Sequence, residues 1–271
     1  MTDIEIIVSD FDGTLMHDDK TLPKQFGRLL HKLDDRRIRF IAASGRQYYN
    51  LREQLTDELA DYVDYIAENG AITVIGNEIC TIEEMSAEDI IDVVSAVRAQ
   101  EGCYAILCGA EGAYYEDDVP ELTRHARMYY ARLSLVENVL DCIATDQICK
   151  IAVFNSHHAE EVILPALQRF EDSLQVTLSG DCWVDVMNQN VNKGHALQEM
   201  LARMNVYHEC CMAFGDYLND LELLEVSGES FAMDNGHPLL RERFPRSAGN
   251  NNEDGVIHTI CRELNIQLEE E

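Results

Sequence analysis

Residues 4–15 read IEIIVSDFDGTL, and this stretch decides the fold. A short run of isoleucine and valine that is bounded by a glycine predicts a buried strand of the kind found in parallel sheets. Asp10 and Asp12 then lie at the carboxyl end of that strand, which is the edge where open α/β sheets bind ligands. Side chains two residues apart in a strand share a face, so we expect the two carboxylates side by side. They repel each other, and one must bind a cation or a proton. The alternative is a solvated Asp-Gly turn.

The acidic composition argues against nucleic acids and anionic membranes as partners, and it constrains how a phosphate could bind. The chain has 271 residues, of which 46% are hydrophobic, enough for a large globular core. Lysine and arginine total 21 against 50 aspartate and glutamate residues, so the formal charge is −29. Such a surface repels nucleic acids and anionic membranes, and we expect neither as a partner. Binding a phosphorylated substrate then requires a local reversal of charge by a metal ion, a lysine and backbone N–H groups.

The cysteines and the apolar segments indicate the compartment. The nine cysteines show neither a CxxC pair nor the Cys/His spacing of a zinc site. Their odd number and their place in apolar runs, such as residues 149–154, favour buried free thiols in a reducing compartment. No basic segment followed by an apolar core opens the chain, and no apolar run approaches the roughly 20 residues that span a bilayer. The sequence therefore predicts a cytoplasmic protein.

The order of elements in the first part of the chain is β-α-β-α-β. After the opening strand, apolar residues recur at helical spacing from Leu22 to Leu33, and residues 38–43 form the next strand candidate. A second helix and a strand ending before Glu68 follow. This order argues for a parallel sheet with helices on both faces. Residues 72–75 and 78–81 flank a Gly-Asn turn and are expected to form a hairpin.

The middle of the chain has a different pattern. Residues 83–187 mix helices with strand candidates at 103–108, 149–154 and 182–187, and no carboxylate stands at a strand end there. After Lys193 the helix and strand rhythm returns. We therefore expect an α/β fold with a Rossmann-like core made of residues 1–82 and 188–271, into which residues 83–187 are inserted as an α+β cap domain. The acidic residues 269–271 are expected to be a frayed tail.

Four short segments at the expected strand ends and helix starts carry the chemistry. They read DFDGT at 10–14, SGR at 44–46, NKG at 192–194 and GDYLND at 215–220. Each segment alone is ordinary, because a Ser-Gly pair is usually a turn, a lysine before a helix is usually solvated, and an Asn-Asp pair is usually a cap. Their occurrence in this order on this strand pattern indicates a site.

These segments resemble the four motifs of the haloacid dehalogenase superfamily. The matching positions are Asp10-x-Asp12-Gly13-Thr14, Ser44, Lys193 and Gly215-Asp216-x-x-Asn219-Asp220. ASGR at 43–46, ENGA at 68–71 and NEDGV at 252–256 are similar to landmarks of its Cof-type sugar-phosphatase branch, and residues 83–187 resemble that branch's α/β cap. The chain departs from the branch at Tyr217, where a small residue is common, and at MDNG in 233–236, where MGNA is usual.

The resemblance implies a Mg²⁺-dependent phosphatase that hydrolyses small phosphate monoesters, such as sugar phosphates or related metabolites, through an aspartyl-phosphate. It implies that Asp10 is the nucleophile and that Asp12 is the general acid and base. Mg²⁺ would be bound by Asp10, Asp216 and the backbone carbonyl of Asp12. Asp220 would hold a metal-bound water or orient Lys193.

The resemblance also implies contacts to the phosphate and to the rest of the substrate. The expected phosphate donors are the side chains of Ser44, Lys193 and Asn219 and the backbone N–H groups of Phe11 and Gly45, aided by helix N-termini. Arg46 is a candidate for pairing with the substrate or with a nearby carboxylate. Asn69 is a candidate for lining the entrance or for forming an Asn-Gly turn.

Two other functions stay open at this point. A sugar phosphomutase of the same superfamily returns the phosphoryl group to the sugar instead of to water, and the motifs do not separate it from a phosphatase. A receiver-type signalling domain also holds an aspartyl-phosphate with Asp, Mg²⁺, Ser/Thr and Lys. We rank the receiver lower, because its phosphorylated aspartate comes later in the chain and it lacks a large insert.

Overall fold

The computed structural model describes residues 4–157 and 159–268, and the chain divides into two compact units. The first unit comprises Met1–Gly45, Gln54–Cys80 and Asn192–Glu271, and the second comprises Arg46–Glu53 and Thr81–Val191. The expected domain boundaries at residues 82–83 and 187–188 stay a prediction. The expected tail at 269–271 lies outside the described residues.

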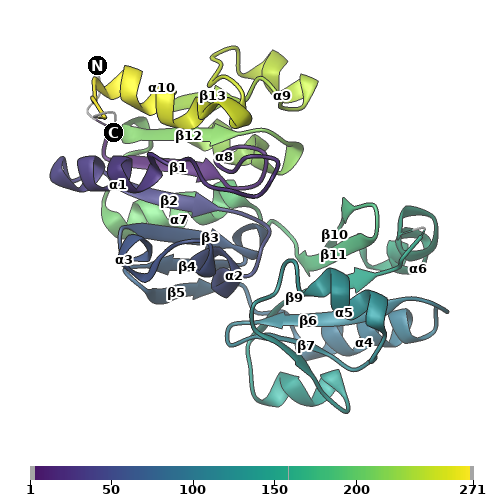
Figure 1. The fold of residues 1–271 in the computed structure, drawn as a ribbon. Coiled ribbons are helices and arrows are strands. Elements are labelled where there is room, and N and C mark those ends of the chain that lie inside the picture. The colour runs from purple at the N-terminus through teal and green to yellow at the C-terminus, as the bar shows by residue number, and fades with distance from the viewer. Residues whose placement is uncertain (1–3, 158, 269–271) are drawn as a thin grey trace. The chain divides into compact units, whose positions relative to one another are not determined.

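A seven-stranded sheet forms the centre of the first unit, in the order β13-β12-β1-β2-β3-β4-β5 (Figure 1). The strands from β13 to β3 run parallel, and β4 runs antiparallel to β3. The parallel core that the sequence predicts is therefore confirmed, and so is the hairpin, because β4 and β5 are hydrogen-bonded neighbours joined by residues 76 and 77. The strands are β1 (Ile6–Asp10), β2 (Arg39–Ala43), β3 (Val63–Ala67), β4 (Ile72–Ile75), β5 (Glu78–Ile82), β12 (Cys211–Gly215) and β13 (Glu229–Ala232).

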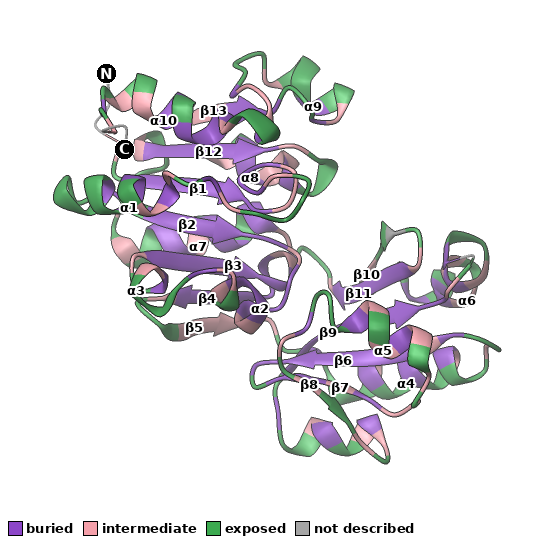
Figure 2. Cartoon of the chain, in the orientation of Figure 1, coloured by how far each residue is buried: buried purple, intermediate pink, exposed green. Residues whose placement is uncertain are grey.

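Helices cover both faces of this sheet. Ile6 and Val8 of β1 pack against Leu197 of α7 and Leu223 of α8 on one face. On the other face the ring of Phe26 in α1 lies 5.2 Å from that of Phe40 in β2. Figure 2 shows the central strands β12, β1, β2 and β3 buried, and α1 and α10 exposed on one side, as their apolar spacing requires. The helices are α1 (Phe26–Asp35), α3 (Asp57–Ala60), α7 (Lys193–Met204), α8 (Leu221–Val226), α9 (Pro238–Arg243) and α10 (Gly255–Leu264).

The alternation along β1 determines where Asp10 points. Ile6 and Val8 face α7, so Asp10, two residues further on, faces the same side. Lys193 is the first residue of α7. The strand pattern and the start of this helix therefore bring the first and third motifs together.

The second unit contains a six-stranded sheet in the order β10-β11-β9-β6-β7-β8. Its pairs are antiparallel except for β7 with β8. The strands are β6 (Tyr104–Gly109), β7 (Ala113–Tyr115), β8 (Leu133–Leu135), β9 (Ile148–Phe154), β10 (Leu174–Gly180) and β11 (Trp183–Asn188). The helices are α2 (Tyr48–Glu53), α4 (Ala87–Arg98), α5 (Pro120–Ala126) and α6 (Leu164–Leu167).

Helix α2 is attached to the second unit by specific contacts. The side chain of Gln47 exchanges two hydrogen bonds with the backbone of Arg132, at 2.9 and 3.0 Å. The hydroxyl of Tyr49 donates to the carbonyl of Ala110 at 3.0 Å. The residues that follow the Ser44-Gly45 motif therefore fold with the second unit.

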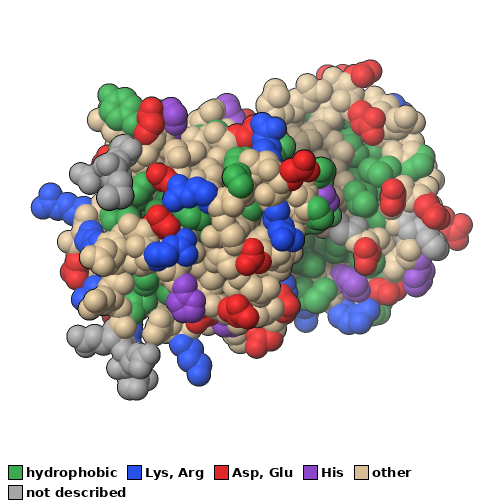
Figure 3. Space-filling view, turned by 90° about the horizontal axis from the view of Figure 1, so that it is seen from above, with side chains coloured by type: hydrophobic (Ala, Val, Ile, Leu, Met, Phe, Trp, Pro, Cys, Tyr) green, Lys and Arg blue, Asp and Glu red, His purple; other side chains and the backbone are tan. Residues whose placement is uncertain are grey.

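The cysteines and the charged side chains are placed as the composition leads one to expect. The nine cysteines are all free thiols, and each is buried or half-buried. Acidic and basic side chains are interspersed on the face that Figure 3 shows. Among the described residues no helix has the length and apolarity that a bilayer crossing requires.

Candidate functional site

Three carboxylates meet at the carboxyl ends of β1 and β12. Asp10 is the last residue of β1, Asp216 follows β12, and Asp220 ends the 3₁₀ turn Leu218–Asp220. One oxygen of each carboxylate lies within 4.8 Å of the other two. Asp10 and Asp220 are buried, and Asp216 is half-buried. Residues more than 200 positions apart thus form one acidic cluster, at the edge of the sheet that the sequence indicates.

Two glycines allow the carboxylates to come this close. Gly13 has a φ of +80°, and a Cβ there would lie 2.6 Å from Oδ2 of Asp216. At Gly215 a Cβ would lie 2.5 Å from the Cβ of Asp220. These positions therefore require glycine, because any side chain would push Asp216 or Asp220 out of the cluster.

Lys193 lies between two of the carboxylates. Its ammonium is 2.5 Å from Oδ1 of Asp10 and 2.6 Å from Oδ1 of Asp220, and the side chain is 1% exposed. Burial alone favours the neutral amine, but the charges of Asp10 and Asp220 raise the pKa of Lys193 above its usual value. One ammonium among three carboxylates leaves about two negative charges without a counterion when all three are ionised.

Asp216 has its own contacts. Its Oδ1 accepts a hydrogen bond of 2.9 Å from the hydroxyl of Thr14. Oδ2 of Asp220 accepts from the backbone N–H groups of Asp216 and Tyr217 at 3.0 and 3.1 Å. Burial, followed by the charge of Asp220, raises the pKa of Asp216 to about 6. Burial and the charge of Asp220 also raise the pKa of Asp10.

The acidic cluster fits a divalent cation. Oδ2 of Asp10 is buried and has no hydrogen-bond partner, which is costly for an anionic oxygen. The cluster offers only oxygen ligands and carries surplus negative charge, and Mg²⁺ prefers such ligands. Asp10 and Asp216, the side chains expected to bind the metal, are both members of it.

The raised pKa of Asp216 gives a testable pH dependence of stability without metal. A folded-state pKa of about 6 against an ordinary 3.8 means that the native state binds the extra proton between these values. Stability from this group is present below pH 3.8 and is lost as the pH rises through about 6. At about 1.36 kcal/mol per pKa unit, the loss amounts to about 3 kcal/mol.

We therefore expect the Tm of the protein in EDTA to rise by several degrees between pH 7 and pH 5, as measured by calorimetry. Asp216→Asn removes this part of the pH dependence. Mg²⁺ raises the Tm more at pH 7 than at pH 5, because protons compete for the same oxygens. An Asp216→Asn protein with the unmodified pH profile would contradict the assignment.

The residues expected on the phosphate side gather at the ends of neighbouring strands. Asp10 pairs in register with Ala43 of β2, so the buried Ser44 comes directly after that position. A Cβ on Gly45 would lie 3.0 Å from the amide of Asn69, and Nδ2 of Asn219 donates to Oδ1 of Asn69 at 3.3 Å. Phe11 is buried directly after Asp10. That these residues contact a phosphate stays a prediction.

Three further residues, Lys20, Thr14 and Arg46, also make contacts in or near the motifs. The ammonium of Lys20 lies 2.9 Å from Oδ1 of Asp12, a contact that no motif in the sequence indicates. Thr14 belongs to the first motif, but the sequence gives no indication of its hydrogen bond to Asp216. Arg46 lies in the second unit, where its Nη1 donates to Oδ1 of Asn50 at 3.0 Å, and its expected substrate contact stays a prediction.

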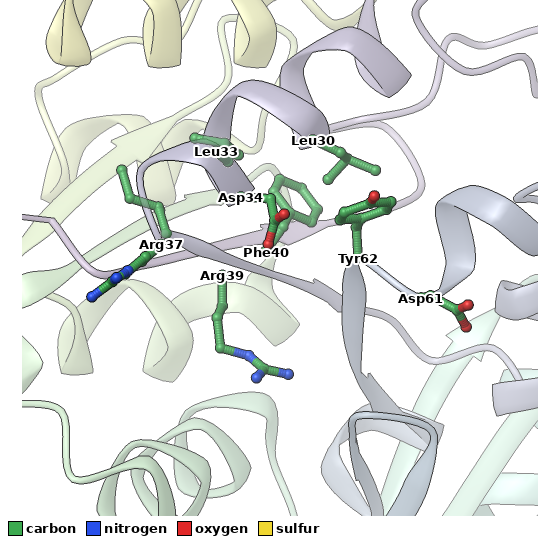
Figure 4. Close-up of a pocket in the computed structure, with 9 residues that line it drawn as sticks. Leu30, Leu33, Asp34, Arg37, Arg39, Phe40, Asp61 and Tyr62 are labelled. Atoms are coloured by element: carbon green, nitrogen blue, oxygen red, sulfur yellow. The ribbon is translucent and has the colours of Figure 1, made fainter.

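A separate pocket of about 380 Å³ lies at the other end of β2 (Figure 4). It is lined by residues of α1, by Asp61 and Tyr62, and by Arg39, the first residue of β2. The guanidinium of Arg39 makes two hydrogen bonds, of 2.6 and 2.7 Å, to the carboxylate of Asp64. Since Asp10 and Ser44 lie at the opposite ends of these parallel strands, this pocket is not part of the candidate site.

Comparison with known families and proteins gives one consistent result. The family of haloacid dehalogenase-like hydrolases matches residues 7–260. A 5-amino-6-(5-phospho-D-ribitylamino)uracil phosphatase, YbjI of Escherichia coli (strain K12), is 29% identical over 267 residues, which are 96% of each chain. An HMP-PP phosphatase of Cronobacter sakazakii is 28% identical over 239 residues, covering 87% of this chain and 86% of that protein.

Solved structures share the fold over nearly the full length. The crystal structure of TM0651 from Thermotoga maritima has a TM-score of 0.86 at 25% identity and covers 98% of both chains. That of SMU.1108c from Streptococcus mutans UA159 has a TM-score of 0.84 at 26% identity, covering 97% of this chain and 100% of the other.

Proposed function

Because the chain belongs to the haloacid dehalogenase-like hydrolases, we propose that it is a Mg²⁺-dependent phosphatase that hydrolyses small phosphate monoesters through an aspartyl-phosphate. The observation that carries the proposal is the buried ammonium of Lys193 between Asp10 and Asp220, within an acidic cluster at the sheet edge. A nucleophilic carboxylate, a fixed cation and a place for a divalent ion are what phosphoryl transfer needs. Sugar phosphates and related metabolites are the substrate class.

The reaction has two steps that share Asp10 and Asp12. In the first, a carboxylate oxygen of Asp10 attacks phosphorus, the bond to the ester oxygen breaks, and Asp12 gives its proton to the leaving alcohol. In the second, water attacks phosphorus and gives a proton to Asp12. Inorganic phosphate then leaves, and Asp10 regains its carboxylate. The half-buried position of Asp12 suits both proton transfers, because they involve substrate and solvent.

Asp10, Asp216 and the backbone carbonyl of Asp12 would hold Mg²⁺, which when bound supplies charge neutralisation for the phosphoryl oxygens. Lys193 fixes one oxygen of Asp10 by its hydrogen bond of 2.5 Å. Asp220 in turn fixes Lys193 and the backbone N–H of Asp216. This set of contacts holds the nucleophile in place before the substrate arrives.

The remaining donors bind the phosphoryl oxygens. These are the Ser44 hydroxyl, the Lys193 ammonium, the Asn219 amide and the backbone N–H groups of Phe11 and Gly45. In a chain with a formal charge of −29, an anion can approach only where such donors and a metal ion reverse the local field. Arg46 and Asn69 are proposed to contact the rest of the substrate.

A substrate screen tests the proposal. The panel contains sugar phosphates, a ribityl-linked aminouracil phosphate and pyrimidine phosphates, each with Mg²⁺ or with EDTA, and bis-p-nitrophenyl phosphate as a diester control. We expect release of inorganic phosphate from at least one monoester, at least about 100-fold slower in EDTA, and none from the diester. No release from any monoester, or equal rates in EDTA, would contradict the proposal. Isomerisation of a sugar phosphate without release of phosphate would instead identify a phosphomutase.

A further inference from the structure

We propose that Asn235 and Asn251 form a clasp that positions Asp12 for proton transfer. Asn235 lies on the loop after β13, and Asn251 opens the 3₁₀ turn Asn251–Glu253 before α10. We call them the Asn235–Asn251 clasp. The inference rests on the proposed function, because it assigns the clasp to the step in which Asp12 acts as general acid.

The clasp holds the backbone on both sides of the turn that follows Asp12. Nδ2 of Asn235 donates to the carbonyl of Gly13 at 2.7 Å. Nδ2 of Asn251 donates to the carbonyl of Met16 and to Oδ1 of Asp18, both at 3.0 Å. The backbone N–H of Asn251 donates to Oδ1 of Asn235 at 3.1 Å, which joins the two asparagines.

The clasped turn is closely linked to Asp12. Met16 forms a bridge with Asp12, and its N–H donates to the carbonyl of Phe11 at 2.8 Å. Lys20, further along the same loop, contacts the carboxylate of Asp12 directly. Any shift of residues 13–20 therefore moves Asp12 or its surroundings.

Asp12 needs such support because β1 ends at Asp10, and among the described residues the only strand-like pairing of Asp12 is its isolated bridge with Met16. Gly13, with its φ of +80°, adds conformational freedom at the next position. A general acid has to lie within hydrogen-bond distance of the leaving oxygen, and a displacement of about 1 Å costs about 100-fold in rate. Asn251, 1% exposed, is the buried anchor that fixes this loop across more than 200 residues of sequence.

Asn251 is the better residue for a test. The loop of Asn235 is tied to Asp216, because the N–H of His237 donates to the carbonyl of Asp216 at 2.7 Å. A change at Asn235 would therefore also disturb an expected metal ligand. Among the described residues, the side chain of Asn251 donates hydrogen bonds only to the loop that follows Asp12.

The first readout is the dependence on the leaving group. An alkyl phosphate needs a proton from Asp12, whereas p-nitrophenolate leaves without one. We expect Asn251→Ala to lower kcat/KM for an alkyl phosphate by about 100-fold and for p-nitrophenyl phosphate by less than about tenfold. A smaller folded fraction alone would lower both by the same factor, and equal losses would overturn the inference.

The second readout is hydrogen exchange, which does not depend on activity. Asn251→Ala is expected to speed exchange in the peptide covering residues 11–21 by about tenfold, equivalent to about 1.4 kcal/mol. Asn77→Gly is the control. It removes a hydrogen bond of 2.9 Å to Asp61 on the β4–β5 hairpin and keeps the positive φ that residue 77 requires. It should change neither the exchange of residues 11–21 nor the ratio of the two esters.

A further pair of variants tests which hydrogen bond of Asn251 matters. Asn251→Asp keeps the shape but turns acceptors toward Asp18 and the carbonyl of Met16, so it should be at least as harmful as Asn251→Ala. Adding Asp18→Asn restores a donor at residue 18 only, and the carbonyl of Met16 still faces an acceptor, so the alkyl phosphate activity should stay low. Recovery of that activity by Asp18→Asn, or unchanged exchange in residues 11–21 of Asn251→Ala, would overturn the clasp. If the unmodified protein hydrolyses neither ester, the proposed function falls, and hydrogen exchange alone decides whether the clasp exists.

Discussion

Replacing Asp10 by asparagine is expected to lower kcat by about 10⁴-fold or more, because it removes the attacking carboxylate. The substitution keeps the shape of the side chain and its place at the end of β1. The amide is a poor nucleophile, and it also removes one expected ligand of Mg²⁺. The measurement is phosphate release in Mg²⁺, together with trapping of a phosphorylated protein by acid quench, which only the unmodified chain should give.

The fold should survive this change. Burial and the charge of Asp220 raise the pKa of Asp10, so its ionised form is costly in the native state at neutral pH. Asparagine removes that cost and weakens the contact with Lys193, so the two effects on stability oppose each other. We therefore expect the Tm in EDTA to move by only a few degrees.

Asp64→Asn is the matched control for Asp10→Asn. Asp64 is also a buried aspartate of the same sheet, 2% exposed, and is bound to Arg39 and to the N–H of Gly76. Its replacement should lower stability and leave kcat per folded molecule unchanged. Appreciable Mg²⁺-dependent hydrolysis by Asp10→Asn, or equal loss of activity in both variants, would refute the nucleophile assignment.

The parts of the site that lie on regular elements were predictable from the sequence. The run before Asp10 predicts a strand, and the alternation of its side chains sends Asp10 to the face that α7 covers. Lys193 at the start of α7 and Asp216 at the end of β12 follow from the same reasoning. The predicted resemblance to the haloacid dehalogenase superfamily is confirmed by the family match.

The parts that depend on loops were not predictable. Lys20 reaches Asp12 from a loop residue with a φ of +67°, and an exposed lysine carries no periodic signal. Asn235 and Asn251 act through hydrogen bonds to backbone carbonyls more than 200 residues away, which leave no local pattern. Contacts of this kind depend on the tertiary structure alone.

In the second unit, too, some elements were predictable from the sequence and others were not. The strand candidates at 103–108, 149–154 and 182–187 correspond to β6, β9 and β11 with shifts of one residue. Strands β7 and β8 have three residues each, too few for an alternation to be recognised. The helical spacing in α2 predicts a helix but says nothing about the unit on which it packs, and the contacts of Gln47 and Tyr49 decide that.

Replacing Lys193 by methionine is expected to abolish activity and to destabilise the fold strongly. Methionine fills a similar volume but leaves Asp10, Asp216 and Asp220 without their buried cation. Removing one partner of a buried ion pair costs about 3–5 kcal/mol. The phosphate also loses its fixed ammonium, so we expect kcat/KM to fall by about 10³-fold or more.

The pH dependence separates the loss of charge from the loss of packing. Without Lys193 the pKa values of Asp10 and Asp216 rise further, since its charge lowers both. The destabilisation measured by thermal unfolding in EDTA should therefore be small at pH 5 and grow toward pH 8. Mg²⁺ should restore part of the stability at pH 8, because a divalent ion replaces the missing positive charge, but it should not restore turnover.

Lys150→Met provides the matched control for Lys193→Met. Lys150 is a buried lysine of the second unit, 2% exposed, with its ammonium 3.8 Å from Asp185. Its loss should also destabilise the fold, but Mg²⁺ should raise the Tm of this variant only as much as that of the unmodified protein, since the cluster of Asp10, Asp216 and Asp220 is unchanged. Unchanged kinetics in Lys193→Met would remove this lysine from the site. A loss of stability that does not vary with pH would show that packing, and not the charge of the ammonium, is what Lys193 contributes.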